Sequence, residues 1–293
     1  MPTSVSWPPR REYLAPSLTL RGREFTWGAR TYLMGVINAT PDSFSGDGLG
    51  ADPAAAARRA AAFEAAGADI LDIGGQPPPP GAPRRLSPGG GPPACPPLPS
   101  PPRAGPRPIS IDTFHASVAR QAIAAGAGLV NDIWGLRFDP AMADVIAESN
   151  VPLVAMHNQR GREFHDVAGD IRDGFHATLA ICHRHGIAPG SVILDPGFGF
   201  GWTSQQNLEM IRRLPELWDF RLPILIGTSR KSTIGDVLDA PVGRRLEGTA
   251  ATVALSIGAG ADLVRVHDVA EMAKVVRVAD AVVRANWTAS EQP

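Results

Sequence analysis

Four short segments of the chain combine an apolar run with a cluster of reactive side chains. They read MGVINATPDSFSGDG at 34–48, LDPGFGFG at 194–201, IGTSRKS at 226–232 and VRVHD at 264–268. An apolar run that breaks into glycine, proline and charged residues is typical of a buried strand followed by a loop. Each strand end therefore offers groups that can hold an anion, read a polar ligand or coordinate a cation.

Carboxylate and amide side chains end three apolar runs, at Asp112, at Asn131 and, in the 194–201 segment, at Asp195. Such groups can read the donor and acceptor edge of a guanine-like heterocycle. A helix cap or a turn would explain each of them taken singly, because Asp and Asn commonly begin loops of this kind. Together they favour a ligand, because buried carboxylates are unfavourable unless something pairs with them.

Cationic side chains occur at two other strand ends. Arg265 and His267 alternate along one run, so both leave the strand on the same side and can grip one anion. An ion pair of Arg265 with Asp262 or Asp268 at a barrel rim is the alternative. The other cation, Lys231, follows a Gly-Thr-Ser turn that permits close approach of a ligand.

Smaller polar and aromatic residues complete the candidate site. Ser232 can hold a carboxylate, although a helix cap explains it almost as well. Phe198 and Phe200 are expected to wall the pocket and stack on a ligand ring, while core packing would account for Phe198 alone.

Eight strand-like runs must position these groups. Ala-rich stretches with helical spacing separate most of the runs, for example 53–66, 115–125, 168–185, 243–258 and 268–285. Strict alternation implies parallel strands, and eight units favour an α/β fold closed as a TIM (β/α)8 barrel, whose C-terminal face carries the active site. The runs are 33–38, 69–75, 108–112, 128–132, 151–157, 191–195, 222–227 and 262–266.

Two stretches do not follow this alternation of strand and helix. Within the N-terminal segment 1–32, residues 18–32 alternate apolar with polar and predict a β-hairpin that plugs the barrel. Residues 76–108 predict a Pro-rich irregular loop, with the second crossover helix missing or disordered, because interior proline opposes a helix. Either this is a Pro/Gly insert, or the coding sequence is locally out of frame, which resequencing of the DNA would decide.

Length and composition limit the number of domains, the kinds of partner and the cellular location. With 293 residues, 44% of them hydrophobic, the chain can form one barrel domain over 1–293. The net charge is only -1, so nothing in the composition indicates a basic surface for nucleic acid. No apolar run is long enough to span a membrane. Two cysteines make no disulfide framework, so we expect a cytoplasmic protein.

The motifs in order resemble the dihydropteroate synthases, pterin-binding barrels of folate biosynthesis. The resemblance rests on MGVINATPDSFSGDG, GADILDIGG, SIDTF, NDIWG, DPGFGFG, GTSRKS and RVHDV, and it covers the chain except 76–106. It implies condensation of 6-hydroxymethyl-7,8-dihydropterin diphosphate with p-aminobenzoate to give 7,8-dihydropteroate and diphosphate, with Mg2+ present. It also implies a homodimer built through the outer helices of the last units, for which 243–258 is suited.

The resemblance carries roles onto particular residues. Asp112 and Lys231 would be catalytic, and Asn38 would supply an oxygen to Mg2+. If the bond to diphosphate breaks before the amine attacks, a carboxylate at Asp112 would stabilise the positive charge on the pterin methylene. Substrate binding falls to Asn131, Asp195, Phe200, Lys231, Ser232, Arg265, Val266 and His267.

One departure from the family keeps two alternatives open. The family usually has Glu, Ser, Thr, Arg, Pro and Gly after its second strand, where residues 76–81 read QPPPPG. A non-catalytic or impaired pterin-binding relative, which binds better than it turns over, is therefore one alternative. A methyltetrahydrofolate-dependent methyltransferase is the other, but it would need neither the GTSRKS loop nor Arg265 with His267.

Overall fold

Eight parallel strands form one sheet in the computed structural model, which describes residues 11–38, 53–74 and 107–288. The strands lie in the order β8-β7-β6-β5-β4-β3-β10-β9. An isolated parallel bridge between Leu194 and Ile224 brings β8 against β9 and closes the ring. The strands are β3 (Tyr32–Asn38), β4 (Ile70–Gly74), β5 (Ile109–Asp112), β6 (Leu129–Asp132), β7 (Leu153–Met156), β8 (Val192–Asp195), β9 (Leu225–Ile226) and β10 (Leu263–Val266).

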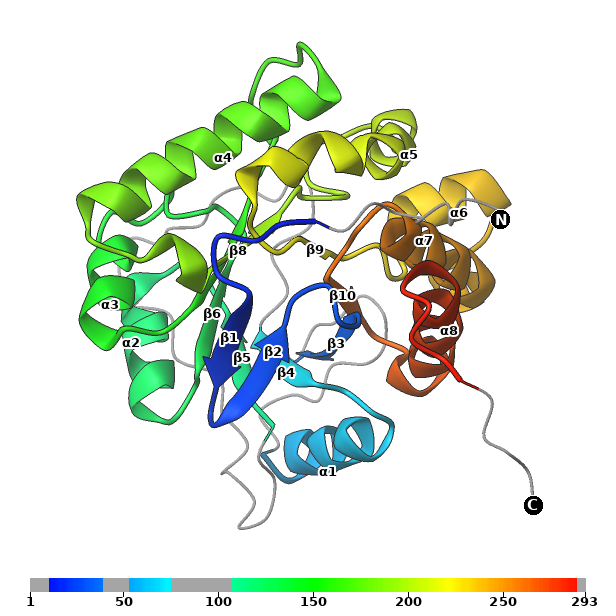
Figure 1. The fold of residues 1–293 in the computed structure, drawn as a ribbon, viewed down its shortest axis with the longest axis horizontal. Coiled ribbons are helices and arrows are strands. Elements are labelled where there is room, and N and C mark those ends of the chain that lie inside the picture. The colour runs from blue at the N-terminus through cyan, green and yellow to red at the C-terminus, as the bar shows by residue number, and fades with distance from the viewer. Residues whose placement is uncertain (1–10, 39–52, 75–106, 289–293) are drawn as a thin grey trace, which may run out of the picture.

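Helices surround this sheet, as Figure 1 shows, so the predicted (β/α)8 barrel is confirmed. The five helical stretches expected from the sequence agree with the observed helices to within three residues at each end. Three short 3-10 helices lie at Pro189–Ser191, Leu214–Phe220 and Val242–Arg244. The α-helices are α1 (Pro53–Ala65), α2 (Ala116–Ala124), α3 (Met142–Ser149), α4 (Val167–Arg184), α5 (Ser204–Arg213), α6 (Ser232–Leu238), α7 (Leu246–Gly258) and α8 (Val269–Val283).

Capping residues set where the two helices beside the later strands begin. Asp166 precedes α4, and its carboxylate accepts a hydrogen bond of 2.8 Å from the Gly169 amide. Thr203 and Gln206 form a capping box at the start of α5. Because these caps satisfy amides that would otherwise lack partners, they fix the ends of the loops that follow β7 and β8.

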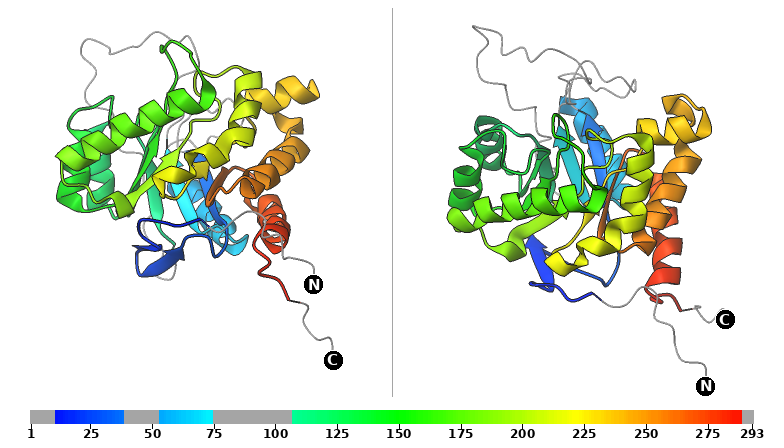
Figure 2. Two further views of the ribbon diagram at one scale, coloured as in Figure 1. Left: turned by 45° about the horizontal axis from the view of Figure 1, so that its top comes forward. Right: turned by 90° about the horizontal axis from the view of Figure 1, so that it is seen from above.

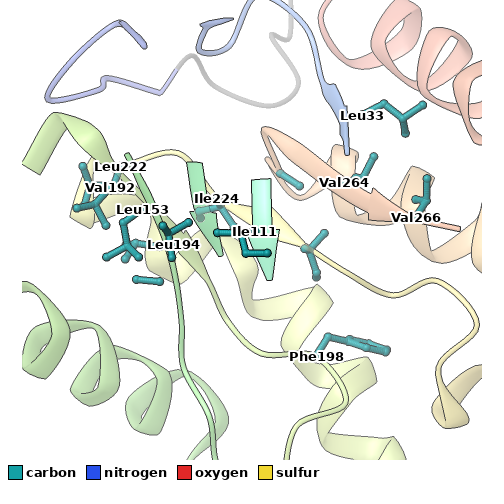
Figure 3. Packing of buried hydrophobic residues seen from close by; sticks show 14 of the residues in the cluster. Leu33, Ile111, Leu153, Val192, Leu194, Phe198, Leu222, Ile224, Val264 and Val266 are labelled. Carbon is teal, nitrogen blue, oxygen red and sulfur yellow. The ribbon is translucent and has the colours of Figure 1, made fainter. Parts of the chain in front are cut away.

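Apolar residues on the outer side of the strands pack under the helices. Leu153, Val192 and Leu194 lie close together in this layer, as Figure 3 shows. Residues of opposite orientation face the barrel interior, because side chains alternate along a strand. Those at the N-terminal end form a separate apolar cluster of Met34, Ile70, Leu129, Val154, Ile193, Leu225 and Leu263.

An antiparallel hairpin of β1 (Ser17–Leu20) and β2 (Arg23–Thr26) covers this inner cluster. It lies at one end of the barrel in Figure 2. Both turn residues, Arg21 and Gly22, have positive φ, as a two-residue type I′ turn requires. Phe25 is 1% exposed and its ring centroid lies 4.8 Å from that of Tyr32, so the predicted plug is confirmed.

One expectation from the sequence falls largely beyond these ranges. The predicted loss of the second crossover helix concerns 76–108, of which only Arg107 and Pro108 are described. Among the helices that are described, none is both long and apolar enough to cross a membrane.

The hairpin contributes stability to the barrel through its buried ring. Replacing Phe25 with Ala should lower the free energy of unfolding by about 3–5 kcal/mol, because it empties a closed apolar site. Urea denaturation followed by circular dichroism measures the change. The exposed Glu24→Ala variant is the matched control, and equal small losses in both variants would contradict a packed plug.

Candidate active site

The interior of the barrel changes from apolar to polar along each strand. On β10, Leu263 belongs to the apolar inner cluster, and Arg265 follows two residues later on the same side. Ile193 and Asp195 follow the same rule on β8. The C-terminal face therefore collects polar side chains from six strands, namely Asn38, Asp72, Asp112, Asn131, Asp195 and Arg265.

Arg265 lies between two carboxylates. Its Nε donates to Asp72 Oδ2 at 2.7 Å, and its Nη2 donates to Asp112 Oδ2 at 2.8 Å. The Asn131 amide donates to the same Asp72 oxygen at 3.1 Å. The Arg265 guanidinium therefore joins β10 to β4 and β5, while its Nη1 donates to none of the described residues.

Asp72 is a residue of this candidate site that the sequence prediction missed. Its side chain is completely buried and contacts two predicted substrate-binding residues, Arg265 and Asn131. The signal was present, because Asp72 interrupts the apolar run DILDIGG, and an acid inside a strand is unfavourable without a buried cation.

The other two acids at the C-terminal opening of the barrel, here called the mouth, are Asp112 and Asp195. The pKa of each is raised above the usual value for Asp. Burial raises the pKa of the Asp112 carboxyl, although the Arg265 guanidinium opposes the shift. Burial also raises the pKa of Asp195 to about 6, although Asp195 Oδ1 accepts a hydrogen bond of 2.8 Å from the Gly197 amide. Both groups would gain from a ligand that brings N–H donors or positive charge.

Lys231 lies over the ring of Phe200 on the same face. Its Nζ is 4.1 Å from the centroid of that ring, a cation–π contact. A Cβ at Gly199, whose φ is +81, would lie 2.9 Å from Lys231 Cδ, so this position leaves room for the lysine stem. Burial and the charge of Arg265 lower the pKa of Lys231 to about 8, and Asp195 opposes that shift.

His267 is held by Ser229. The Ser229 hydroxyl accepts a hydrogen bond from the His267 amide at 3.2 Å and lies 3.1 Å from Nδ1 of its ring. Burial, followed by the charge of Arg265, lowers the pKa of His267 to about 3. The ring is therefore neutral at pH 7 and keeps one N–H to donate.

The structure places three predicted site residues differently from the others. Val266 faces the outer apolar layer and is fully buried there, so its side chain does not line the mouth. Phe198 also packs in that layer, as core packing alone would predict. Ser232 lies exposed in the first turn of α6, where Lys231 and not Ser232 is the N-cap residue.

The alternative interpretation of Arg265, an ion pair with Asp262 or Asp268 at the barrel rim, is not what the structure shows. Asp268 pairs with Arg230, whose Nη2 lies 2.5 Å from Asp268 Oδ1. Asp262 pairs with Arg11 at 3.0 Å instead. With both acids engaged elsewhere, Arg265 faces the interior, where it pairs with Asp72 and Asp112.

The predicted metal ligand Asn38 ends β3 and is buried, 7% exposed. It lies beside Gly74 of β4 in the sheet register. In the described part of the chain, no three His, Cys, Asp or Glu residues form a group that could hold a metal by themselves. A single amide oxygen suits a cation that brings its other ligands as water and substrate phosphate.

Comparison with known families agrees with this arrangement. A family model described as pterin binding enzyme matches residues 34–267, from the second half of the first barrel strand to His267. That span contains every predicted site residue. The chain belongs to the pterin-binding enzymes.

Individual relatives show which enzymes of this family the chain is similar to. The dihydropteroate synthase of Synechocystis is 42% identical over 93% of this chain and 97% of its own length. The structure of the Clostridium difficile dihydropteroate synthase in the presence of pteroic acid has a TM-score of 0.76 and 40% identity, covering 88% of this chain and 98% of that one. The structure of the Xanthomonas albilineans dihydropteroate synthase with 4-aminobenzoic acid has a TM-score of 0.80 and 34% identity. The match covers 92% of this chain and 98% of that one. Within the family the chain belongs with the dihydropteroate synthases, which are transferases.

The raised pKa of Asp195 predicts that this acid destabilises the empty protein. Well below pH 3.8, the ordinary pKa of Asp, the carboxyl is neutral in both folded and unfolded chains, so Asp195→Asn should change little there, and its effect is still small at pH 4. Between there and pH 6 the unfolded chain ionises first, and the wild type loses stability relative to the variant. At pH 7, Asp195→Asn should therefore raise the free energy of unfolding by about 2–3 kcal/mol.

Urea denaturation of both proteins at pH 4 and pH 7 tests this expectation. Asp173→Asn, on the exposed side of α4, is the control and should show no such gain at the higher pH. A variant that is no more stable than the wild type at pH 7 would show that Asp195 is not held against ionisation.

Proposed function

We propose that this chain joins 6-hydroxymethyl-7,8-dihydropterin diphosphate to p-aminobenzoate and releases 7,8-dihydropteroate and diphosphate, within one barrel domain that spans 1–293. The observation that carries the proposal is the convergence of Asp112, Asp195, Lys231 and Arg265 on one mouth. The pteroic acid of one solved relative and the 4-aminobenzoic acid of another support the same pair of substrates.

The pterin ring binds between the acids and Lys231. Asp195 accepts hydrogen bonds from the N–H groups along the ring edge, and this contact favours its ionised form. Asn131 offers both a donor and an acceptor to the same ring, and its contact with Asp72 fixes its orientation. Lys231 donates to the ring carbonyl through its ammonium group, which lies over Phe200.

The diphosphate binds beside the β10 residues. Arg265 offers Nη1, and neutral His267 offers its remaining ring N–H. As the bond from the methylene carbon to the diphosphate oxygen breaks, positive charge spreads into the pterin, and the Asp112 carboxylate stabilises it. The amine nitrogen of p-aminobenzoate then bonds to that carbon and loses a proton to the released diphosphate or to water. Phe200 and Ser232 hold the benzoate near the attacking position.

Asn38 would hold Mg2+ on the diphosphate side of the mouth. When bound, the ion neutralises charge on the leaving diphosphate. Only one protein ligand is then needed, because Mg2+ commonly keeps waters and phosphate oxygens as its remaining ligands.

A product assay tests the proposed function directly. Purified protein incubated with both substrates and Mg2+ should form dihydropteroate, detected by chromatography, and should form none when p-aminobenzoate is omitted. Absence of product with both substrates would contradict the proposal.

Asp112 should matter for turnover more than for folding. Asp112→Asn removes the charge that stabilises the pterin cation, so kcat should fall about 100-fold or more, the range for loss of one electrostatic stabiliser. Steady-state kinetics measure it. Asp144→Asn, on the exposed surface of α3, removes the same charge far from the mouth and should keep the wild-type kcat. An Asp112→Asn enzyme with near-normal kcat would remove this residue from the mechanism.

The sequence of residues 76–81 supports a slower enzyme and not a different one. The family's hydroxyl and guanidinium groups have no counterparts in QPPPPG, so positioning for transfer is weaker than binding. These residues lie outside the described ranges, and slow turnover stays a prediction, as does the cytoplasmic location. A methyltransferase is disfavoured, since it would leave the Arg265 and His267 pair without a role.

We also propose that two copies associate through α7 and α8. Leu255, Val278 and Val282 are each more than 60% exposed on these helices. They lie along a groove of about 1050 Å³ that also involves α5. Exposed apolar side chains gathered in this way are typical of protein interfaces, and a second copy of the chain accounts for them.

Charge placed on this surface should separate the copies. The double variant Val278→Asp with Val282→Asp should sediment as a monomer in analytical ultracentrifugation, while the wild type sediments as a dimer, because burying two carboxylates is unfavourable. Phe164→Asp, which alters an exposed apolar residue elsewhere, is the control. A monomeric wild type, or a dimer that survives both charges, would contradict the proposed interface.

A further inference from the structure

Arg160 is a cation at the mouth that the proposed mechanism does not use. It lies in the loop after β7, and its Cζ is 4.8 Å from the centroid of the Phe200 ring, the ring that Lys231 also contacts. Unlike Arg230 and Arg265, its guanidinium makes no ion pair with an acid in the described part of the chain. A half-buried guanidinium without a carboxylate is available to an anionic ligand.

The backbone that carries Arg160 is firmly held. Its amide donates to Asn158 Oδ1 at 3.2 Å, and the preceding amide, of Gln159, donates to the Phe200 carbonyl at 3.0 Å. Asn158 is 1% exposed and Gln159 is 3% exposed. At Gly201 a Cβ would collide with the Arg160 backbone, so the loops after β7 and β8 are in direct contact. The guanidinium is thus placed over Phe200 before any ligand arrives.

The position of Arg160 separates it from the diphosphate. Arg265 lies on β10 and His267 directly follows that strand, and both β8 and β9 lie between β10 and β7. Two substrates carry negative charge in the proposed reaction, as diphosphate and as carboxylate. A cation over Phe200, the ring that the proposed function places against the benzoate, is matched to the carboxylate.

We propose that Arg160 binds the carboxylate of p-aminobenzoate and sets the preference of the site for an anionic amine substrate. This assignment rests on the proposed function and adds to it a residue that selects the second substrate. Arginine suits the task because its planar fork can donate two hydrogen bonds to one carboxylate while its face stays on Phe200.

Comparing a charged with a neutral second substrate tests this assignment. Calorimetric titration with 4-aminobenzoate and with 4-aminobenzamide, in the presence of 6-hydroxymethylpterin and inorganic diphosphate, gives the affinity for each. Arg160→Gln should weaken 4-aminobenzoate about tenfold or more and leave 4-aminobenzamide within about twofold, since only the carboxylate makes a charge-assisted contact. Arg160→Lys should lose less than Arg160→Gln.

Arg162→Gln is the matched control, because it removes the same charge from an exposed position two residues further along. It should leave both affinities unchanged. Equal losses for the two compounds in Arg160→Gln would show a packing role, and an unchanged affinity for 4-aminobenzoate would show that Arg160 does not bind its carboxylate; either overturns the assignment.

The product assay separates this proposal from the proposed function. A wild type that binds 4-aminobenzoate in an Arg160-dependent manner but forms no product would contradict the function alone. A wild type that forms product and shows no Arg160-dependent preference would contradict the Arg160 assignment alone, and one that binds neither compound would contradict both.

Discussion

A buried guanidinium held between two carboxylates is the interaction on which the mouth of this barrel depends. Arg265 is acceptable inside the sheet because Asp72 and Asp112 surround it, and each acid is acceptable because of the arginine. The contact joins three strands, so it also sets the positions of the groups beside it. Asn131 is oriented through Asp72, and Asp112 is kept on the same mouth as Arg265 and the proposed diphosphate site.

The two ends of the barrel serve different purposes as a result. The N-terminal end is filled by apolar side chains and covered by the hairpin, and it contributes stability. At the C-terminal end, burial opposes the charge of Asp195 and of Lys231 and shifts the pKa of both toward neutrality. The empty site therefore holds unfavourable electrostatics that a pterin diphosphate relieves, which makes binding selective for a ligand with matching donors and charge.

Much of this could be predicted from the sequence, because strands and loops are local features. All eight strands and the hairpin were predicted, and the largest error concerned β9, where Pro223 cannot donate to a sheet and only Leu225–Ile226 forms a strand. The grouping of Asp112, Asp195 and Lys231 also followed from their places at strand ends.

Contacts between distant segments could not be predicted in this way. Arg265 and Asp72 are 193 residues apart, and nothing near either one shows which of several acids is the partner. The sequence suggested Asp262 or Asp268 because they are close along the chain, but those acids are used by Arg11 and Arg230. Likewise, the place of Arg160 over Phe200 depends on two loops meeting, which no local pattern encodes.

The central claim is that ring recognition and diphosphate binding share one mouth, linked through Arg265. A crystal structure of the protein soaked with 6-hydroxymethyl-7,8-dihydropterin diphosphate tests it most directly. The account predicts the ring edge against Asp195 and Asn131, with the diphosphate on Arg265 of β10 and on His267, which follows that strand. A ring bound elsewhere, or a diphosphate that does not contact Arg265, would contradict it.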